Sequence, residues 1–193
     1  MQKNIPFVHS VIKEIIHRGD TVLDATCGNG NDTLMLAKAC GNSGHVYAFD
    51  IQAQAINSTK ALLNNNSIHH VTYIHDSHAH IDQYIPTTMN GKITAAIFNL
   101  GYLPRGDKTI ITTPASTITA IKKLLQFIRI GGRIALVIYH GHPGGQEGKN
   151  EVLSFVTSLS QTHYEVVQYA FLNHKNSPPF VIIIEKMKQE EQL

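Results

Sequence analysis

The segment VLDATCGNGNDT, residues 22–33, decides the fold class. An apolar strand runs into a glycine-containing turn, and polar residues typical of a helix start follow it. Gly28 and Gly30 let the backbone turn tightly and approach a ligand closely, while the next helix offers free N–H groups and a positive dipole end. This arrangement predicts a nucleotide-type cofactor; a tight turn that only caps a helix is the alternative.

The polar residues of the turn indicate which cofactor it holds. Thr33 occupies the place of the third glycine of a dinucleotide fingerprint. Carboxylates at the turn repel a pyrophosphate but attract a ligand with an ammonium and a sulfonium group. We therefore expect S-adenosylmethionine (SAM) rather than a nicotinamide dinucleotide, bound at Asp24, Gly28, Asn29, Gly30, Asn31 and Asp32.

The ends of the next two strands complete the predicted cofactor site. Asp50 ends the second strand, where an acidic residue binds ribose hydroxyls in both SAM and nicotinamide sites. Gln52 follows it and is a candidate for ribose or adenine contact. Asp76, Ser77 and His78 end the third strand, at the expected adenine edge. The histidines of HDSHAH also suggest a metal site, but no carboxylate is clearly placed as an outer ligand, and we expect no metal.

The remaining pattern predicts an α/β fold with a Rossmann-like sheet. Strands alternate with helices as far as residue 160, which indicates a parallel sheet covered by helices on both faces. The last two strands follow each other directly, so one of them should be reversed. Helices are expected at 10–20, 31–41, 53–66, 113–132 and 150–160, and strands at 21–27, 45–51, 71–76, 93–98, 133–141, 164–173 and 179–186.

Composition limits the classes of protein and partner. The 193 residues suit one domain, 1–193, and 42% apolar with 16% charged residues is ordinary for a globular protein. A net charge of +2 does not by itself announce nucleic-acid binding. The two cysteines form no CxxC pair, and no apolar stretch resembles a signal peptide or a membrane span. We expect a cytoplasmic protein without a membrane partner.

The segment NLGYLP, residues 99–104, is the candidate acceptor site. It resembles, in a relaxed form, the [D/N]-P-P-[Y/F] motif with which amino methyltransferases aim a nitrogen at the SAM methyl group. Asn99 would accept N–H groups and Tyr102 would stack on a planar ring, although both could simply end and pack a strand. His140 and His142, with Asp24 or Asn99 nearer the cofactor, are the candidate bases, and one of the two histidines is expected to contact the substrate. Cys27 is expected to be a packing residue rather than a nucleophile.

Taken together, the motifs resemble the YtqB family of class I SAM-dependent methyltransferases over nearly the whole chain. The resemblance implies a sheet of seven strands with the last one reversed, and SAM as cofactor. It also implies methylation of the amine of 5-aminomethyl-2-thiouridine at the tRNA wobble position, giving 5-methylaminomethyl-2-thiouridine. His174 departs from the glutamine expected at its position. The resemblance is carried by VLDATCGNGNDT, AFDIQ, HDSHAH, FNLGYLPRGDK, YHGHPGG and FLNHKNSPPFVIIIEK.

Basic residues near the site are the predicted RNA contacts. Arg105 and Lys108 follow the acceptor motif, and Lys175 lies in a loop expected at the same edge of the sheet. We expect them to bind the anticodon region of tRNA, and the small net charge leaves a homodimer possible. The alternatives are methylation of rRNA or of a small amine and, more remotely, a nicotinamide-dependent oxidoreductase.

Overall fold

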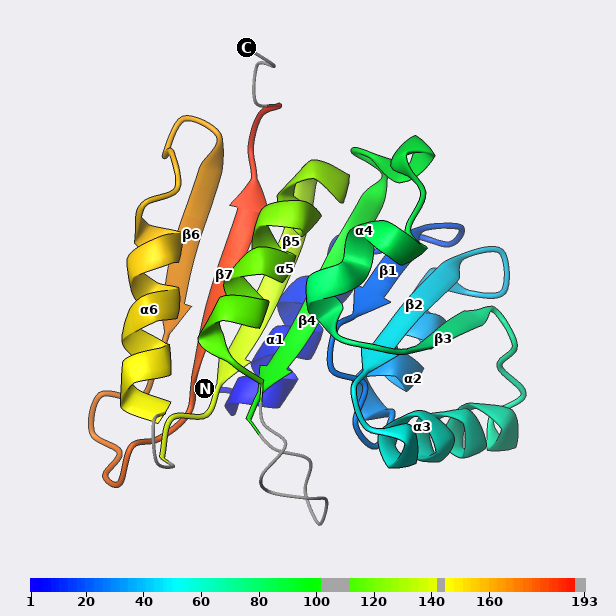
Figure 1. Ribbon diagram of the computed structural model, residues 1–193, viewed down its shortest axis with the longest axis horizontal. Helices are drawn as coiled ribbons and strands as arrows, with labels where there is room; N and C mark the ends of the chain where they lie inside the picture. Colours follow the sequence, from blue (N-terminus) through cyan, green and yellow to red (C-terminus); the bar gives the residue numbers. More distant parts are fainter. Residues whose placement is uncertain (102–111, 142–144, 190–193) are drawn as a thin grey trace.

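The protein is built on one mixed sheet. A computed structural model describes residues 1–101, 112–141 and 145–189. Within these ranges the strand order is β3-β2-β1-β4-β5-β7-β6, and β7 runs antiparallel to both of its neighbours (Figure 1). The predicted sheet with one strand reversed by the C-terminal hairpin is therefore confirmed. The strands are β1 (Thr21–Asp24), β2 (His45–Asp50), β3 (Val71–His75), β4 (Ile93–Leu100), β5 (Ile128–Ile138), β6 (Tyr164–Tyr169) and β7 (Phe180–Lys186).

Helices cover both faces of this sheet, as predicted. In Figure 1, α4, α5 and α6 lie in front of the sheet, and α1, α2 and α3 lie behind it. No helix in the described ranges is both long and apolar enough to cross a membrane. The helices are α1 (Asn4–Lys13), α2 (Asn31–Cys40), α3 (Ala53–Asn65), α4 (Ile81–Tyr84), α5 (Pro114–Phe127) and α6 (Gly145–Thr157), with 3₁₀ turns η1 (His78–His80) and η2 (Thr87–Met89).

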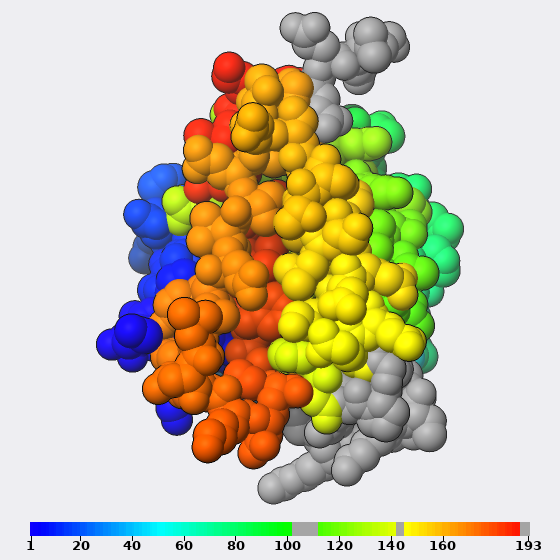
Figure 2. All heavy atoms as spheres, turned by 90° about the vertical axis from the view of Figure 1, so that its left-hand side faces the viewer, coloured from blue at the N-terminus to red at the C-terminus, as the bar shows by residue number. Residues whose placement is uncertain are grey.

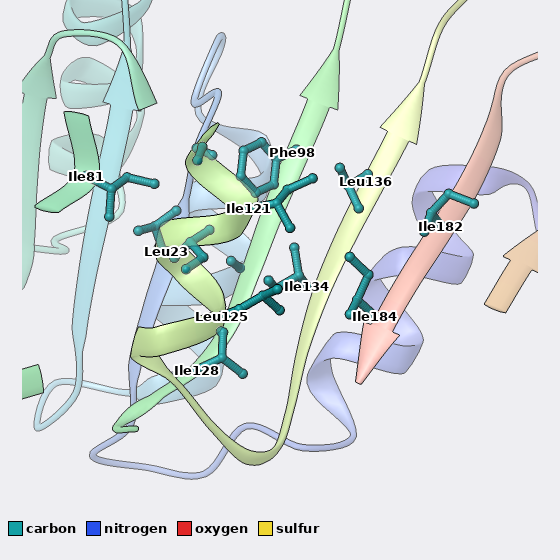
Figure 3. Close-up of a cluster of buried hydrophobic side chains, with 14 of the residues drawn as sticks. Leu23, Ile81, Phe98, Ile121, Leu125, Ile128, Ile134, Leu136, Ile182 and Ile184 are labelled. Carbon is teal, nitrogen blue, oxygen red and sulfur yellow. The ribbon is translucent and has the colours of Figure 1, made fainter. Parts of the chain in front are cut away.

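The larger apolar core lies between the sheet and α5. β4 is buried along nearly its whole length, because helices cover both of its faces, and this explains its unbroken apolar run. The side chains of Leu23, Phe98 and Leu136 project from neighbouring strands toward Ile121 of α5 (Figure 3). A second cluster on the opposite face joins α1 and α2 to β1, β2 and β4. The strands are thereby fixed relative to one another, and so are their carboxyl ends.

The first helix begins earlier than its sequence suggested. We expected it at 10–20 with Ser10 as its cap, but α1 spans Asn4–Lys13. Pro6 fits the first turn, where a helix needs no N–H donor. Ser10 lies in mid-helix and donates its hydroxyl to the carbonyl of Phe7, at 2.7 Å. Val8 and Ile12 form the buried face of α1.

The predicted boundary between α5 and β5 was also wrong. We expected Gly131 and Gly132 to end the helix, but α5 ends at Phe127 and both glycines lie within β5. Gly131 has φ +72°, and a Cβ on Gly132 would come within 2.8 Å of the Thr94 carbonyl oxygen. The glycines therefore serve an irregularity in the pairing of β4 with β5 rather than a helix end.

Two arginines hold α1 against the sheet. Arg133 on β5 donates to the Val11 carbonyl at 2.8 Å and pairs with Glu14 at 2.6 Å. Arg129 donates to the Ile15 carbonyl at 3.1 Å. These bonds fix the carboxyl-terminal end of α1 against the sheet.

We expect Leu136→Ala to lower the free energy of unfolding by about 2–5 kcal/mol. Leu136 is 0% exposed in the middle of β5, so the truncation leaves a cavity. Leu172→Ala removes the same atoms from a side chain that is 98% exposed and should change stability by less than about 0.5 kcal/mol. Urea denaturation followed by circular dichroism measures both, and equal losses would contradict this placement of the core.

Candidate functional site

A cavity of about 640 Å³ opens at the carboxyl ends of β1, β4 and β5. These strand ends meet at the lower edge of the sheet in Figure 1, where ligands bind in folds of this kind. The described lining contains one carboxylate and several amides but neither lysine nor arginine. The predicted site residues that line it are Gly28, Asn29, Asn31, Asp32, Asn99 and His140.

Asp24 lies beneath the turn rather than on the cavity wall. Its side chain is fully buried, and its two oxygens accept hydrogen bonds from the Thr26 N–H (3.2 Å) and the Thr33 hydroxyl (2.6 Å). Burial, and then the charge of Asp32, raise the pKa of Asp24 to about 7. Thr33, which replaces the third glycine, thus gives the turn a hydrogen bond that links its two ends.

The two glycines of the turn have backbone conformations that favour glycine. Gly28 has φ +52° and Gly30 has φ +82°. A Cβ on Gly30 would lie 2.9 Å from the Cα of Thr59, because α3 approaches the turn closely. Thr59 donates its hydroxyl to the Gly28 carbonyl at 3.1 Å. The turn is therefore fixed from both sides.

Asp50 supports the turn from the end of β2. It accepts hydrogen bonds from the N–H groups of Gly28 (3.0 Å) and Gln52 (2.9 Å). Burial raises the pKa of Asp50, and these two donors partly oppose the effect. Asp50 and Gln52 are half-buried at the β2 edge, outside the lining of the main cavity. Their predicted contacts with a ribose stay a prediction.

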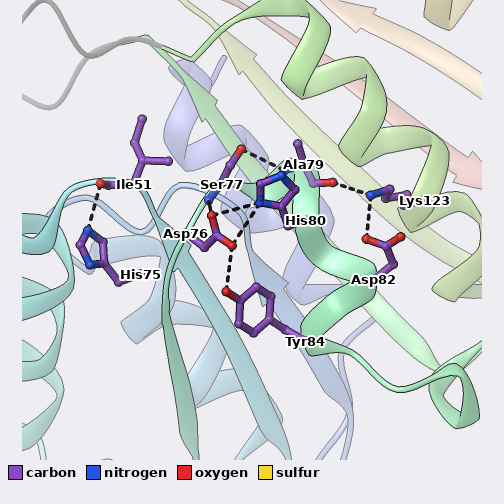
Figure 4. Close-up of polar contacts among 9 residues, drawn as sticks. All are labelled: Ile51, His75, Asp76, Ser77, Ala79, His80, Asp82, Tyr84 and Lys123. Carbon is purple, nitrogen blue, oxygen red and sulfur yellow. Dashed lines mark hydrogen bonds and ion pairs between the residues drawn. The ribbon is translucent and has the colours of Figure 1, made fainter.

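The HDSHAH segment forms its own polar network (Figure 4). Asp76 accepts from the Tyr84 hydroxyl at 2.8 Å and lies 3.1 Å from His80 Nδ1. The Tyr84 bond is the main cause that lowers the pKa of Asp76. Ser77 caps η1 by accepting from the Ala79 N–H at 3.2 Å. Among the residues that the structure describes, no group of three or more His, Cys, Asp or Glu side chains could hold a metal ion.

His78 is buried behind this network. Its Nδ1 donates to the Ala25 carbonyl at 3.1 Å, and its ring meets Phe98 edge-on at 5.4 Å. Its Nε2 has no hydrogen-bond partner within the described parts of the chain. Burial lowers the pKa of His78 to about 4, so the ring is neutral at physiological pH.

Asn99 is the point where the turn and the acceptor edge meet. Its backbone N–H donates to the Thr26 hydroxyl at 2.7 Å, and its side-chain amide donates to Asp32. The same Asp32 carboxylate bonds His9 Nε2 at 2.5 Å. One N–H of the Asn99 amide is thus used by Asp32, and the amide oxygen can accept a hydrogen bond from a ligand.

The other predicted catalytic and RNA-binding residues are only partly placed. His140 is half-buried on the cavity wall, and its ring contacts Phe180 edge-on at 5.6 Å. Lys175 is exposed in the segment between β6 and β7. This segment, residues 170–179, forms the lower, orange part of the surface in Figure 2. Tyr102, Arg105, Lys108 and His142 lie outside the described residues.

Sequence reasoning missed several further residues at the cavity. Ile5 and Ser177 line it, and His9 holds Asp32 from α1. Tyr139 also lines it, and burial followed by the Asp32 charge raises the pKa of its hydroxyl. Tyr139 directly precedes His140 in the quoted YHGHPGG motif, so its place after a strand was a usable signal. Nothing in the sequence linked residues 5–9 to the turn.

Two solved structures that share this fold and more than 40% of its residues are described as methylases or methyltransferases. A putative rRNA methylase from Clostridium thermocellum is 42% identical with a TM-score of 0.92, covering 97% of this chain and 100% of that one. A putative methyltransferase from Streptococcus mutans, in complex with SAH (S-adenosylhomocysteine), is also 42% identical, with a TM-score of 0.86 over 97% and 99% of the two chains. Fold and site together define this chain as a methyltransferase with a Rossmann-like sheet.

The family can also be stated. The family model described as "Putative rRNA methylase" matches residues 46–185. A chloroplastic "tRNA (mnm(5)s(2)U34)-methyltransferase" from Arabidopsis thaliana is 37% identical over 194 residues, covering 96% of this chain and 70% of that protein. The chain belongs to this rRNA methylase family, as its resemblance to the YtqB family implied.

We expect Gly30→Ala to destabilise the protein by more than about 2 kcal/mol, since it adds a collision with Thr59 to the cost of a positive φ. Gly91→Ala is the matched control, because Gly91 has φ +67° with no atom within 4 Å of the added Cβ. It should cost only about 1–2 kcal/mol. Urea denaturation compares the two, and equal losses would exclude the collision.

Asp24→Asn should stabilise the protein progressively more, relative to wild type, as the pH rises from about 4 to about 7. The raised pKa means that folded wild type keeps the Asp24 proton that the unfolded chain has already released in this window, so wild-type stability falls there. Above about pH 7 the difference should stay constant. Urea unfolding at pH 5 and pH 8 measures it, and a difference independent of pH would contradict the raised pKa.

Proposed function

We propose that this protein is a SAM-dependent tRNA methyltransferase. It would methylate the aminomethyl nitrogen of 5-aminomethyl-2-thiouridine at the wobble position, giving 5-methylaminomethyl-2-thiouridine. The observation that carries the proposal is Asn99, which lines a cavity of acid and amide groups at the end of the cofactor turn and donates its amide N–H to Asp32. The Arabidopsis relative, named for this uridine, supports the choice of substrate.

The cavity suits the proposed cofactor in its charge. SAM supplies a methyl group on a positively charged sulfur. The cavity offers the oxygen acceptors of Asp32, Asn29 and Asn31 to cationic and polar groups. Its described lining contains no lysine or arginine that would pair with a pyrophosphate. This lining disfavours the oxidoreductase alternative. Asp50, and the β3 edge at Asp76 and Ser77, are proposed to hold the nucleoside part.

The acceptor must lose one proton before transfer. An alkylamine is mostly protonated at neutral pH, and its nitrogen needs a free lone pair to attack. That nitrogen then forms a bond to the methyl carbon while the carbon–sulfur bond breaks and its electron pair stays on sulfur. The positive charge thereby moves from sulfur to nitrogen, and the overall reaction releases one proton. Asn99 accepts an N–H of the amine, and Asp32 stabilises the charge that develops on it.

His140 and the loop residues form the proposed substrate side. His140 lines the same cavity as Asn99, which supports its proposed role as a base or substrate contact. Lys175 protrudes at the same edge and is proposed to contact RNA phosphates. Tyr102, Arg105, Lys108 and His142 keep their proposed roles from the sequence. We place the reaction in the cytoplasm and retain a homodimer as part of the proposal, which a sedimentation experiment would decide.

A second candidate function is methylation of rRNA. The description of the family model favours it, since it speaks of rRNA. The same site chemistry serves an amine on either RNA, or a small amine, so only the substrate differs. A test of the proposed function must therefore offer these substrates in parallel.

The test incubates the protein with labelled SAM and, in parallel reactions, total tRNA from cells lacking the gene, rRNA from the same cells, or a small alkylamine. The RNA is then digested to nucleosides, and the products are identified by mass. We expect 5-methylaminomethyl-2-thiouridine to appear as its aminomethyl precursor disappears. Asn99→Ala should slow the transfer by about 100-fold, since the amine is no longer aimed. Asn42→Ala, an exposed position at the end of α2, is the control and should keep full activity. Label in rRNA or in a small amine, with none in tRNA, would overturn the substrate assignment.

A further inference from the structure

A histidine from the first helix reaches the acceptor side of the cavity. His9 Nε2 lies 2.5 Å from Asp32 Oδ1, and Asn99 donates its amide to the other oxygen of the same carboxylate. The three residues come from α1, α2 and β4. The side chains of His9 and Asp32 are 24% and 11% exposed, so this contact is largely shielded from solvent.

The position of His9 is set by contacts on both sides of α1. Asn4 donates to the Pro179 carbonyl at 2.6 Å, and Phe7 stacks on Tyr169 at 4.0 Å. Ile5, one helical turn before His9, lines the cavity. His9 therefore faces the site because the helix that carries it is fixed at its start by the β6–β7 segment.

The hydrogen atoms in this cluster have defined places. A carboxylate can only accept, so the His9 Nε2 and the Asn99 Nδ2 must both carry hydrogen toward Asp32. Each Asp32 oxygen keeps a second lone-pair direction, and the Asn99 amide oxygen stays available to a ligand. The cluster thus presents oxygen acceptors, held in a fixed orientation, to the cavity.

We propose that His9 is a positioning residue for methyl transfer: by donating to Asp32, it orients the Asp32–Asn99 pair to receive an alkylammonium or alkylamine group. This inference rests on the proposed function. Two groups have this chemistry, the acceptor amine of the substrate and the α-ammonium of the cofactor's methionine part. The contact of Asp32 with Asn99, the acceptor residue, favours the acceptor amine of the substrate as the source of the bound nitrogen group.

The experiment compares His9→Leu, His9→Gln and His17→Leu. Leucine removes the donor but keeps bulk, glutamine keeps an N–H donor, and His17 lies exposed just beyond α1 as the matched control. If the acceptor is the source, His9→Leu should lower kcat/KM for tRNA about tenfold or more, the range for losing a charge-assisted hydrogen bond. His9→Gln should stay within about threefold of wild type, and His17→Leu should be unchanged. The unfolding temperature of each variant shows that it is folded.

A binding measurement separates the two sources. S-adenosylhomocysteine keeps the α-ammonium group of SAM. 5′-Methylthioadenosine has the same thioadenosine part but lacks the amino-acid part. If the cofactor ammonium is the source, His9→Leu should weaken the first ligand about tenfold and leave the second unchanged. If the acceptor is the source, both affinities should match wild type. Isothermal titration calorimetry measures them without any RNA.

Three results would overturn the role of His9. They are wild-type kinetics and binding in folded His9→Leu, equal weakening of both nucleosides, and a His9→Gln variant as impaired as His9→Leu. If wild-type protein transfers no methyl group to tRNA, the proposed substrate fails instead. His9→Leu is then assayed with the RNA or amine that the wild-type protein does methylate, and wild-type kinetics on that substrate together with an unchanged affinity ratio would reject the role of His9.

Discussion

The parallel pairing of β1 with β4 is the constraint on which the site depends. Asp24 stands opposite Ile97, and beyond it the Ala25 N–H bonds the Ile97 carbonyl at 2.9 Å. Both strands end at the same edge, so Thr26 meets the backbone of Asn99. Thr26 also donates its N–H to Asp24. Asp24 beneath the turn and Asn99 at the acceptor side are thus linked through Thr26 by two hydrogen bonds. Methyl transfer requires an in-line approach, and this pairing supplies the alignment before any ligand binds.

Three carboxyl groups interact at the turn, since the charges of Asp32 and Asp50 both act on Asp24. Asp24 is fully buried near Asp32 and Asp50, and both neighbours raise its pKa, although burial raises it more. Folding therefore favours the protonated form of Asp24. A cationic ligand in the cavity would favour the ionised form, so part of its binding energy would come from relieving this repulsion. The described lining offers no lysine or arginine that could do the same. A turn of this charge is suited to a sulfonium compound and unsuited to a pyrophosphate.

The sequence predicted the features that depend on local pattern. The glycine turn, the place of Asn99 at a strand end and the reversed strand of the C-terminal hairpin were readable, because each depends on one short segment of characteristic pattern. The α5–β5 boundary was misjudged because two glycines were taken as a helix end, whereas backbone crowding at Gly132 requires glycine within the strand. His9 was not predictable, since its role arises only when α1 meets α2 across 23 positions of the chain. Asp24 was predicted to bind the cofactor, and its full burial beneath the turn follows from tertiary packing that no motif encodes.

The reversed hairpin links the edge of the sheet to the acceptor site. β7 pairs with β5, and the segment between β6 and β7 holds the start of α1 through Pro179, while Tyr169 donates its hydroxyl to the Gln2 carbonyl at 2.6 Å. Arg133 fixes the end of the same helix from β5. The helix that carries His9 is thus held by strands on the far side of the sheet from the cofactor turn. A purely parallel sheet would give residues 170–179 no route back along β5, and α1 would lose the contacts at its start. The reversal of one strand therefore contributes to the geometry of the acceptor side as well as to the closure of the sheet.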